Sequence, residues 1–100
     1  VINVTSKMGS LEDNTSGHSY IYRSSKAALN MITRNLAIDL QEDGIVTIAL
    51  HPGWVQTDMG GPNAVLSVTD SIGSMRSVID RVGPAESGRF LDYDGTPIPW

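Results

Sequence analysis

A tyrosine and a lysine four residues apart are the residues of this 100-residue chain whose types and spacing are best suited to chemistry. They are Tyr22 and Lys26, in the segment Tyr-Arg-Ser-Ser-Lys. On a helix, positions i and i+4 share a face, with Cβ atoms about 6 Å apart. A lysine ammonium stabilises the phenolate of a nearby tyrosine, so the pair is suited to general acid–base catalysis. The alternative is a chance pairing, because short motifs also recur by accident.

Polar groups also follow two apolar segments that are typical of strands. Ser6 comes directly after Val1–Thr5, and Pro52 and Gly53 come directly after Val46–His51. Ligands of open α/β sheets bind at the carboxyl ends of the strands. A serine hydroxyl in this place could hydrogen-bond a substrate oxygen. The alternative is a serine that only begins a loop.

The turn after the second strand could contact a planar ligand. Its glycine lets the backbone approach a bound molecule closely. The Val55 backbone and the Thr57 hydroxyl follow within four residues of Gly53, where they could bind a polar planar group such as a carboxamide. An ordinary strand-to-helix turn is the alternative.

The elements that must position these residues alternate between strand and helix. Apolar residues recur at a spacing of four over a helix expected from about Tyr20 to Asp43, which Gly44 would end. A second helix fits Val68–Val82 with Ser67 as its cap, and Gly88–Tyr93 is a weaker strand. This alternation predicts right-handed crossovers on a parallel sheet.

The expected fold class is therefore α/β, in the order strand-helix-strand-helix-strand. The two clearest strand segments are almost continuously apolar, which is typical of parallel strands buried on both faces. Three strands alone would leave the edge of the first strand uncovered. We therefore expect residues 1–100 to be the C-terminal, catalytic part of one doubly wound, Rossmann-like domain, with the N-terminal cofactor-binding half absent from this chain.

Composition and charge argue against several kinds of partner. The formal net charge of −4 argues against nucleic acid and against anionic membrane surfaces. No apolar run is long enough to cross a membrane. The chain has no cysteine, and its two histidines, His18 and His51, are far apart, so no metal site is expected. His18 is expected to be solvated, and His51 to end a strand and bond locally.

Three spaced motifs, taken together and in this order, resemble the short-chain dehydrogenases/reductases. They are Ser6 with Gly9, Tyr22 with Lys26 in the setting Tyr-x-x-Ser-Lys-Ala-Ala-Leu, and Pro52-Gly53 with Thr57. The segment His51–Gly61 and the ending Tyr93–Trp100 are similar to one branch of that family, the sniffer- and C-factor-like carbonyl reductases.

The resemblance implies an NAD(P)-dependent oxidoreductase that reduces a carbonyl or oxidises the alcohol. It implies that Tyr22 gives the proton, that Lys26 holds the nicotinamide ribose and supports Tyr22, and that Ser6 orients the carbonyl. Cofactor contacts are implied for Tyr22, Lys26, Pro52, Gly53, Val55 and Thr57. Trp54 and Met59 would lie near the substrate pocket.

The branch also implies the cofactor, the partners and the location. NADP is the expected cofactor, with NAD as the alternative, and the substrate is a small-molecule carbonyl compound. The complete protein is expected to be a homodimer or homotetramer in the cytoplasm. The alternative from another class is a non-enzymatic, C-factor-like signalling or interaction fragment. The intact set of Ser6, Tyr22 and Lys26 favours the enzyme.

Overall fold

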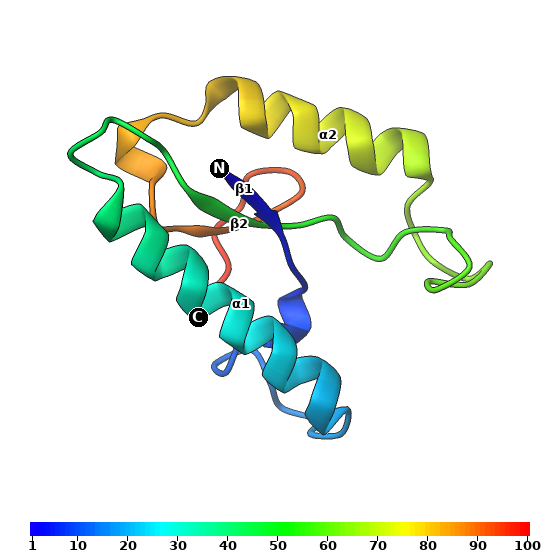
Figure 1. Ribbon diagram of the computed structural model, residues 1–100. Helices are drawn as coiled ribbons and strands as arrows, with labels where there is room; N and C mark the ends of the chain where they lie inside the picture. Colours follow the sequence, from blue (N-terminus) through cyan, green and yellow to red (C-terminus); the bar gives the residue numbers. More distant parts are fainter.

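The computed structural model describes residues 1–100 and confirms the expected alternation of strands and helices (Figure 1). Two short 3-10 helices, η1 and η2, are added to it. The elements in chain order are β1 Ile2–Val4, η1 Lys7–Gly9, α1 Tyr20–Asp39, β2 Ile48–His51, α2 Val68–Arg81, η2 Pro84–Glu86 and β3 Phe90–Asp92.

The three strands form one parallel sheet in the order β1-β2-β3. Ile2 lies opposite Ile48, and His51 lies opposite Asp92. Because all three strands run in the same direction, their carboxyl ends meet at one edge of the sheet. The residues that follow β1 and β2 are thereby brought to that edge, as the sequence predicted.

The strands are shorter than the apolar segments that predicted them. The chain enters β2 at Ile48 rather than at Val46, because the Thr47 N–H is bound to the Ser87 hydroxyl at 3.1 Å instead of to a neighbouring strand. At the far end of β3 the chain turns after Asp92, whose carbonyl accepts the Gly95 N–H at 2.9 Å.

Helices α1 and α2 cover opposite faces of the sheet (Figure 1). Side chains alternate between the two faces along each strand, so Ile48 and Leu50 face α2 while Ala49 faces α1. The cluster on the α2 side consists of Ile48, Leu50, Met75, Val78 and Leu91. The cluster on the α1 side consists of Ala49, Phe90 and Ile98, and Trp100 stacks on Phe90 with ring centroids 5.4 Å apart.

Helix α1 ends at Asp39, earlier than the expected limit near Asp43. The chain continues in a tight turn in which Ile45 N–H bonds Leu40 C=O and Gly44 N–H bonds Gln41 C=O. This pair of bonds is a Schellman-type ending, and it requires the left-handed backbone that Gly44 adopts at φ +70°. Gly44 therefore ends the helical path as predicted, but it lies in the turn that follows α1 and not at the end of the helix itself.

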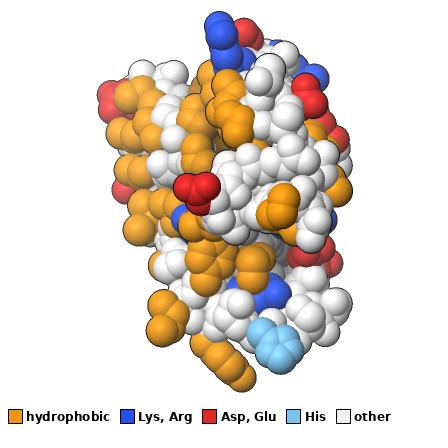
Figure 2. Space-filling view, turned by 90° about the vertical axis from the view of Figure 1, so that its right-hand side faces the viewer, with side chains coloured by type: hydrophobic (Ala, Val, Ile, Leu, Met, Phe, Trp, Pro, Cys, Tyr) orange, Lys and Arg blue, Asp and Glu red, His pale blue; other side chains and the backbone are white.

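Both helices expose apolar side chains on the faces turned away from the sheet. Met31, Ile32 and Ile38 of α1 are all more than half exposed, and Ile72 and Ile79 of α2 are also exposed. Figure 2 shows hydrophobic side chains gathered over the face seen from the right-hand side of Figure 1. Neither helix has the length and apolar character needed to span a membrane.

Candidate active site

Tyr22 and Lys26 share one face of the first turns of α1. The Lys26 Nζ lies 5.6 Å from the centroid of the Tyr22 ring, and both residues are partly buried. The chain contains one ion pair, between Lys7 and Asp13, so Lys26 has no carboxylate partner. An ammonium without a carboxylate partner can donate its hydrogen bonds to a ligand.

Arg23, which sequence reasoning did not single out, fixes the loop that leads into α1. Its Nε donates to His18 O at 3.1 Å and its Nη2 to Ser16 Oγ at 3.2 Å, while Nη1 reaches Met8 O at 3.4 Å. His18 and Ser19 have φ values of +65° and +55°, which are uncommon for residues other than glycine. The guanidinium thus holds a strained entry to α1 one residue from Tyr22.

Ser6 lies at the carboxyl end of β1 and caps η1. It is 7% exposed, and its Oγ accepts the Met8 N–H at 3.1 Å. A hydroxyl oxygen that accepts a hydrogen bond keeps its own proton for donation. Ser6 is therefore held in one orientation while its O–H can still donate to a carbonyl oxygen.

Gly9 allows η1 to lie directly against α1. A Cβ added at Gly9 would come within 2.9 Å of the Lys26 main-chain carbon, the Lys26 Cβ and the Asn30 Nδ2. The main-chain atom cannot move aside as a side chain can, so a residue larger than glycine would push the two elements apart. The Ser-x-x-Gly spacing therefore brings Ser6 to the part of α1 that carries Lys26.

A buried polar clamp fastens β1 and the residue after it to the same face of α1. Thr5 Oγ1 donates to Asn30 Oδ1 at 2.9 Å, and Asn3 Nδ2 donates to Thr33 Oγ1 at 2.9 Å. Thr33 in turn donates to Leu29 O at 2.8 Å. The one feature of the sequence that indicated this clamp was the presence of polar residues on the face of α1 that is turned toward the sheet, at helical spacing from Lys26.

Removing the Thr5 hydroxyl is expected to destabilise the fold. In Thr5→Val the Asn30 Oδ1 loses the hydroxyl that donates to it, and its Nδ2 already has no hydrogen-bond partner. A buried polar group left without a partner costs about 1–3 kcal/mol. Urea denaturation should show that loss in the free energy of unfolding, whereas Thr5→Ser keeps the hydroxyl and should lose less. Equal losses for the two variants would show that the hydroxyl does not support the fold.

The Pro52-Gly53 turn runs from β2 into a short pairing with the chain before α2. Gly53 has φ +85°, and a Cβ there would overlap Leu66 and come within 2.9 Å of the Tyr93 ring. Leu66 accepts the Gln56 N–H at 2.8 Å and donates to Trp54 O at 3.1 Å. In an extended chain the peptide groups alternate in direction, so the intervening Val55 N–H points away from Leu66.

Thr57 and Trp54 both stabilise the turn that follows. Thr57 Oγ1 accepts the Gly60 N–H at 3.0 Å and lies 3.4 Å from Val55 O. The Trp54 indole Nε1 donates to Gly60 O at 2.8 Å. Sequence reasoning assigned the Thr57 hydroxyl to a ligand, and the structure engages it within the turn. Met59 is 87% exposed at the tip of this turn.

Gly60→Ala is expected to open this turn. The added Cβ would overlap the Val55 carbonyl oxygen, and a backbone atom cannot swing aside. The bonds from Gly60 to Thr57 and Trp54 would be strained or lost, at a cost of about 1–3 kcal/mol in the free energy of unfolding. Gly73→Ala is the matched control, because nothing lies within 4 Å of its Cβ position on α2. It should stabilise the helix by about 0.5–1 kcal/mol. A Gly60→Ala variant as stable as wild type would contradict the geometry.

His51 is the last residue of β2, as expected, but its hydrogen bond is not local in the sequence. Its Nδ1 accepts the backbone N–H of Lys7 at 3.2 Å. Burial lowers the pKa of His51 below its ordinary value of 6.5, and the nearby Lys7 lowers it further, while the carboxylates of Asp92 and Asp13 oppose that shift. The neutral imidazole is therefore the form that this position favours at neutral pH.

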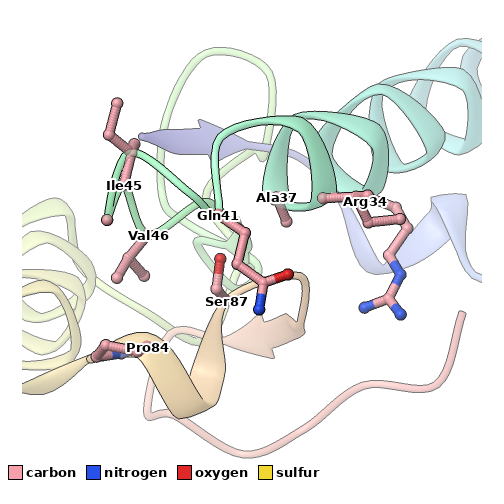
Figure 3. A pocket seen from close by; sticks show the side chains of 9 residues that line it. Arg34, Ala37, Gln41, Ile45, Val46, Pro84 and Ser87 are labelled. Carbon is pink, nitrogen blue, oxygen red and sulfur yellow. The ribbon is translucent and has the colours of Figure 1, made fainter.

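A pocket of about 290 Å³ lies away from these residues, at the end of the sheet where the strands begin (Figure 3). It is formed between the end of α1, the start of β2 and the segment around η2. Figure 3 shows Arg34 and Gln41 extending from the α1 side toward the segment that carries Pro84 and Ser87. Ser6, Tyr22 and Lys26 do not line it, so the pocket is not part of the candidate active site.

Comparison with known sequences defines the class of the protein. Residues 1–64 match the family described as short chain dehydrogenase. Over all 100 residues the chain is 59% identical to C-signal of Myxococcus xanthus and covers 60% of that protein. It is also 44% identical over 101 residues to the 1-hydroxy-2-glutathionyl-2-methyl-3-butene dehydrogenase of Rhodococcus sp. (strain AD45), covering 97% of this chain and 45% of that protein. The chain belongs to the short-chain dehydrogenase family.

Within that family, solved carbonyl reductases share this fold. The chain superimposes on the carbonyl reductase Sniffer of D. melanogaster with a TM-score of 0.97 and 47% identity, over 99% of this chain and 40% of that one. For the NADPH-bound carbonyl reductase from chicken fatty liver the TM-score is 0.91 and the identity 42%, over 99% of this chain and 42% of that one. The expected resemblance to the sniffer- and C-factor-like branch is confirmed. The chain spans less than two thirds of the length of these relatives.

Proposed function

We propose that the protein reduces a small-molecule carbonyl compound, or oxidises the corresponding alcohol, with NADP as its cofactor. The observation that carries the proposal is the close approach of η1 to α1 at Gly9. It packs η1, which the buried Ser6 caps, against the part of α1 that carries Lys26, four residues after Tyr22. The names of the carbonyl reductases with this fold support the reaction class.

Each of the three side chains has a separate part in the proposed reaction. A bound NADPH would supply the hydride that the carbonyl carbon takes up. Tyr22 gives its phenolic proton to the carbonyl oxygen, so that C=O becomes CH–OH. Ser6 donates a hydrogen bond to the same oxygen and holds the carbonyl toward Tyr22. Lys26 stabilises the phenolate that remains on Tyr22 after the proton has left.

The residues of this chain fit the nicotinamide half of such a cofactor. Lys26 has an ammonium without a carboxylate partner, and this ammonium would donate to the ribose hydroxyls. The Val55 N–H points away from the Leu66 pairing and is placed to donate to a carboxamide oxygen, beside the Pro52-Gly53 turn. The diphosphate would be held by a part of the protein outside residues 1–100, because the glycine-rich Gly-x-Gly-x-x-Gly turn that binds it in dinucleotide folds does not occur in this sequence.

Two solved structures with this fold favour NADP over NAD as the proposed cofactor. One is the NADPH-bound carbonyl reductase. The other is an NADP-bound short-chain dehydrogenase/reductase from Burkholderia multivorans, which matches 99% of this chain with a TM-score of 0.85. The expected homodimer or homotetramer and the expected cytoplasmic location stay predictions.

The direct test is turnover by the full-length protein that contains this chain. Purified protein is mixed with NADPH or NADH and a panel of aldehydes and ketones, and oxidation of the cofactor is followed by absorbance. The proposal expects turnover of at least one carbonyl compound, faster with NADPH. Absence of turnover with both cofactors, from protein shown to be folded, would contradict it.

Lys26→Ala is expected to weaken cofactor binding and to lower kcat together. One ammonium is proposed both to hold the ribose and to stabilise the phenolate, so its loss should raise the KM for NADPH about tenfold and reduce kcat as well. Steady-state kinetics measures both quantities. Arg76→Ala, which removes an exposed cation from α2, is the control and should change neither. A Lys26→Ala enzyme with wild-type kinetics would mean that Lys26 is only a surface charge.

The alternative function is non-enzymatic signalling or interaction, and it is favoured by the 59% identity to a relative named C-signal over the whole chain. That alternative expects Tyr22→Phe to leave the biological effect of the protein unchanged. The reductase proposal expects the effect to disappear with turnover.

A further inference from the structure

We propose that the neutral His51 side chain is a positioning residue that ties the Ser6 turn to β2, and that protonation of His51 releases the turn and lowers activity at acid pH. The inference rests on the proposed reductase function, because it concerns the placement of Ser6. It is carried by the hydrogen bond from Lys7 N–H to His51 Nδ1 at 3.2 Å. Lys7 is the residue directly after Ser6 and the first residue of η1.

This bond differs in kind from the others that shape the turn. The Gly9 N–H bonds Ser6 O at 2.9 Å, and the Met8 N–H bonds Ser6 Oγ at 3.1 Å. These two bonds join residues of the turn to each other, so they preserve its shape but do not fix its position on the sheet. The bond to His51 joins the turn to a strand 44 residues further along the chain. Together with the bond from Thr5 N–H to Leu50 O at 2.9 Å, it ties the residues on both sides of Ser6 to β2 at the carboxyl edge of the sheet.

Only the neutral imidazole can make this bond. Nδ1 accepts a hydrogen bond when it carries no proton, which places the single N–H of the ring on Nε2. Once Nδ1 is protonated, two N–H donors face each other and the bond to Lys7 is lost. The turn then keeps its internal bonds, the bond from Arg23 to Met8 O and the bond from Thr5 N–H to Leu50 O at 2.9 Å, but Lys7 loses its tie to β2.

The charged groups around His51 come from three segments. Asp92 of β3 lies opposite His51 in the sheet register. Lys7 is the first residue of η1 and lies next to His51. Asp13 follows η1 and forms an ion pair with Lys7 at 3.8 Å. The two carboxylates favour the imidazolium, while burial and Lys7 disfavour it, and burial is the largest influence. The pKa of His51 is therefore below 6.5. The tie to Lys7 is complete above that pH and is lost as the pH falls through the pKa of the folded protein.

Two substitutions at His51 separate the effect of losing the hydrogen-bond acceptor from the effect of protonating the side chain. His51→Asn places a carbonyl oxygen close to the position of Nδ1, so it can accept the Lys7 N–H at every pH. His51→Leu has an apolar side chain and no acceptor. His18→Asn is the control, because His18 is exposed in the loop before α1 and asparagine tolerates its left-handed backbone.

The first readout is the pH dependence of kcat and KM in the full-length enzyme between about pH 5 and pH 8. Wild type and His18→Asn should lose kcat on the acid side with a shared midpoint below 6.5. His51→Asn should match wild type at neutral pH and keep its kcat at acid pH. His51→Leu should have kcat about tenfold lower at every pH, the scale of one lost hydrogen bond. An acid limb retained in His51→Asn, or wild-type kcat in His51→Leu, would overturn the proposal.

The second readout does not depend on turnover. In the ¹⁵N-labelled full-length protein, the Lys7 amide resonance should shift with the same midpoint as the His51 ring, and it should not titrate in His51→Asn. A Lys7 amide that ignores the His51 titration would overturn the tie even in an active enzyme. If the amide follows His51 but no carbonyl compound is turned over, the tie stands and the proposed function fails.

Discussion

Replacing Tyr22 by phenylalanine is expected to reduce kcat for carbonyl reduction about 10³-fold while leaving the affinity for NADPH nearly unchanged. The substitution removes the phenolic O–H that is proposed to give its proton to the carbonyl oxygen, and it leaves a ring of almost the same size. Lys26 keeps its place above that ring, 5.6 Å from its centroid in the wild-type protein. Steady-state kinetics gives kcat, and titration of the cofactor gives its affinity.

Tyr20→Phe provides the matched control for that experiment. Tyr20 is on the same helix, 84% exposed, and has no lysine four residues further along. The same loss of a hydroxyl should therefore leave kcat within about twofold of wild type, the range of a neutral surface change. Comparable kcat values for the two variants would remove Tyr22 from the reaction.

Ser6→Ala is expected to lower kcat about 10²-fold, the scale of one positioned donor lost from a developing oxyanion. The KM for NADPH should change little, because Ser6 is proposed to bond the carbonyl and not the cofactor. Ser6 also caps η1, and the Met8 N–H would lose its acceptor, so some stability would be lost as well.

The catalytic and structural effects of Ser6 can be separated. Ser6→Thr keeps the hydroxyl and the cap and should recover part of kcat, whereas Ser77→Ala removes a hydroxyl from exposed α2 and should change nothing. If Ser6→Ala unfolds more easily but has wild-type kcat per folded molecule, Ser6 is only a turn residue.

Most of the fold could be predicted from apolar periodicity because the chain forms parallel strands and amphipathic helices of ordinary length. The apolar segments before Ser6 and Pro52 became β1 and β2. The spacing of four predicted α1 but not its buried face, which consists of Asn30, Thr33 and Ala37, while Ile32 is 52% exposed. The ends of elements were less predictable, because they depend on contacts across the chain. Ser87, which bonds the Thr47 N–H and delays the start of β2, is 40 residues away in sequence.

The site could be predicted as a set of residues but not as an arrangement. The Tyr22–Lys26 pairing follows from helical geometry, and the common edge follows from parallel strands. The packing of Gly9 on Lys26, the bond between Thr5 and Asn30, and the hold of Arg23 on the entry to α1 are tertiary contacts between residues of ordinary type. Apart from the polar residues on the inward face of α1, no local pattern distinguishes them from residues in contact with solvent.

The continuity of α1 has a mechanical consequence. The helix runs without a break from the edge that carries Tyr22 to the far end of the sheet, where Ala37 is buried 15 residues later. At a rise of about 1.5 Å per residue this is a rigid rod of about 22 Å between the two points. A small tilt where Ala37 rests would move Tyr22 in proportion to the length of that rod. The packing of Ala37 at one end of the domain thus influences the position of Tyr22 at the other.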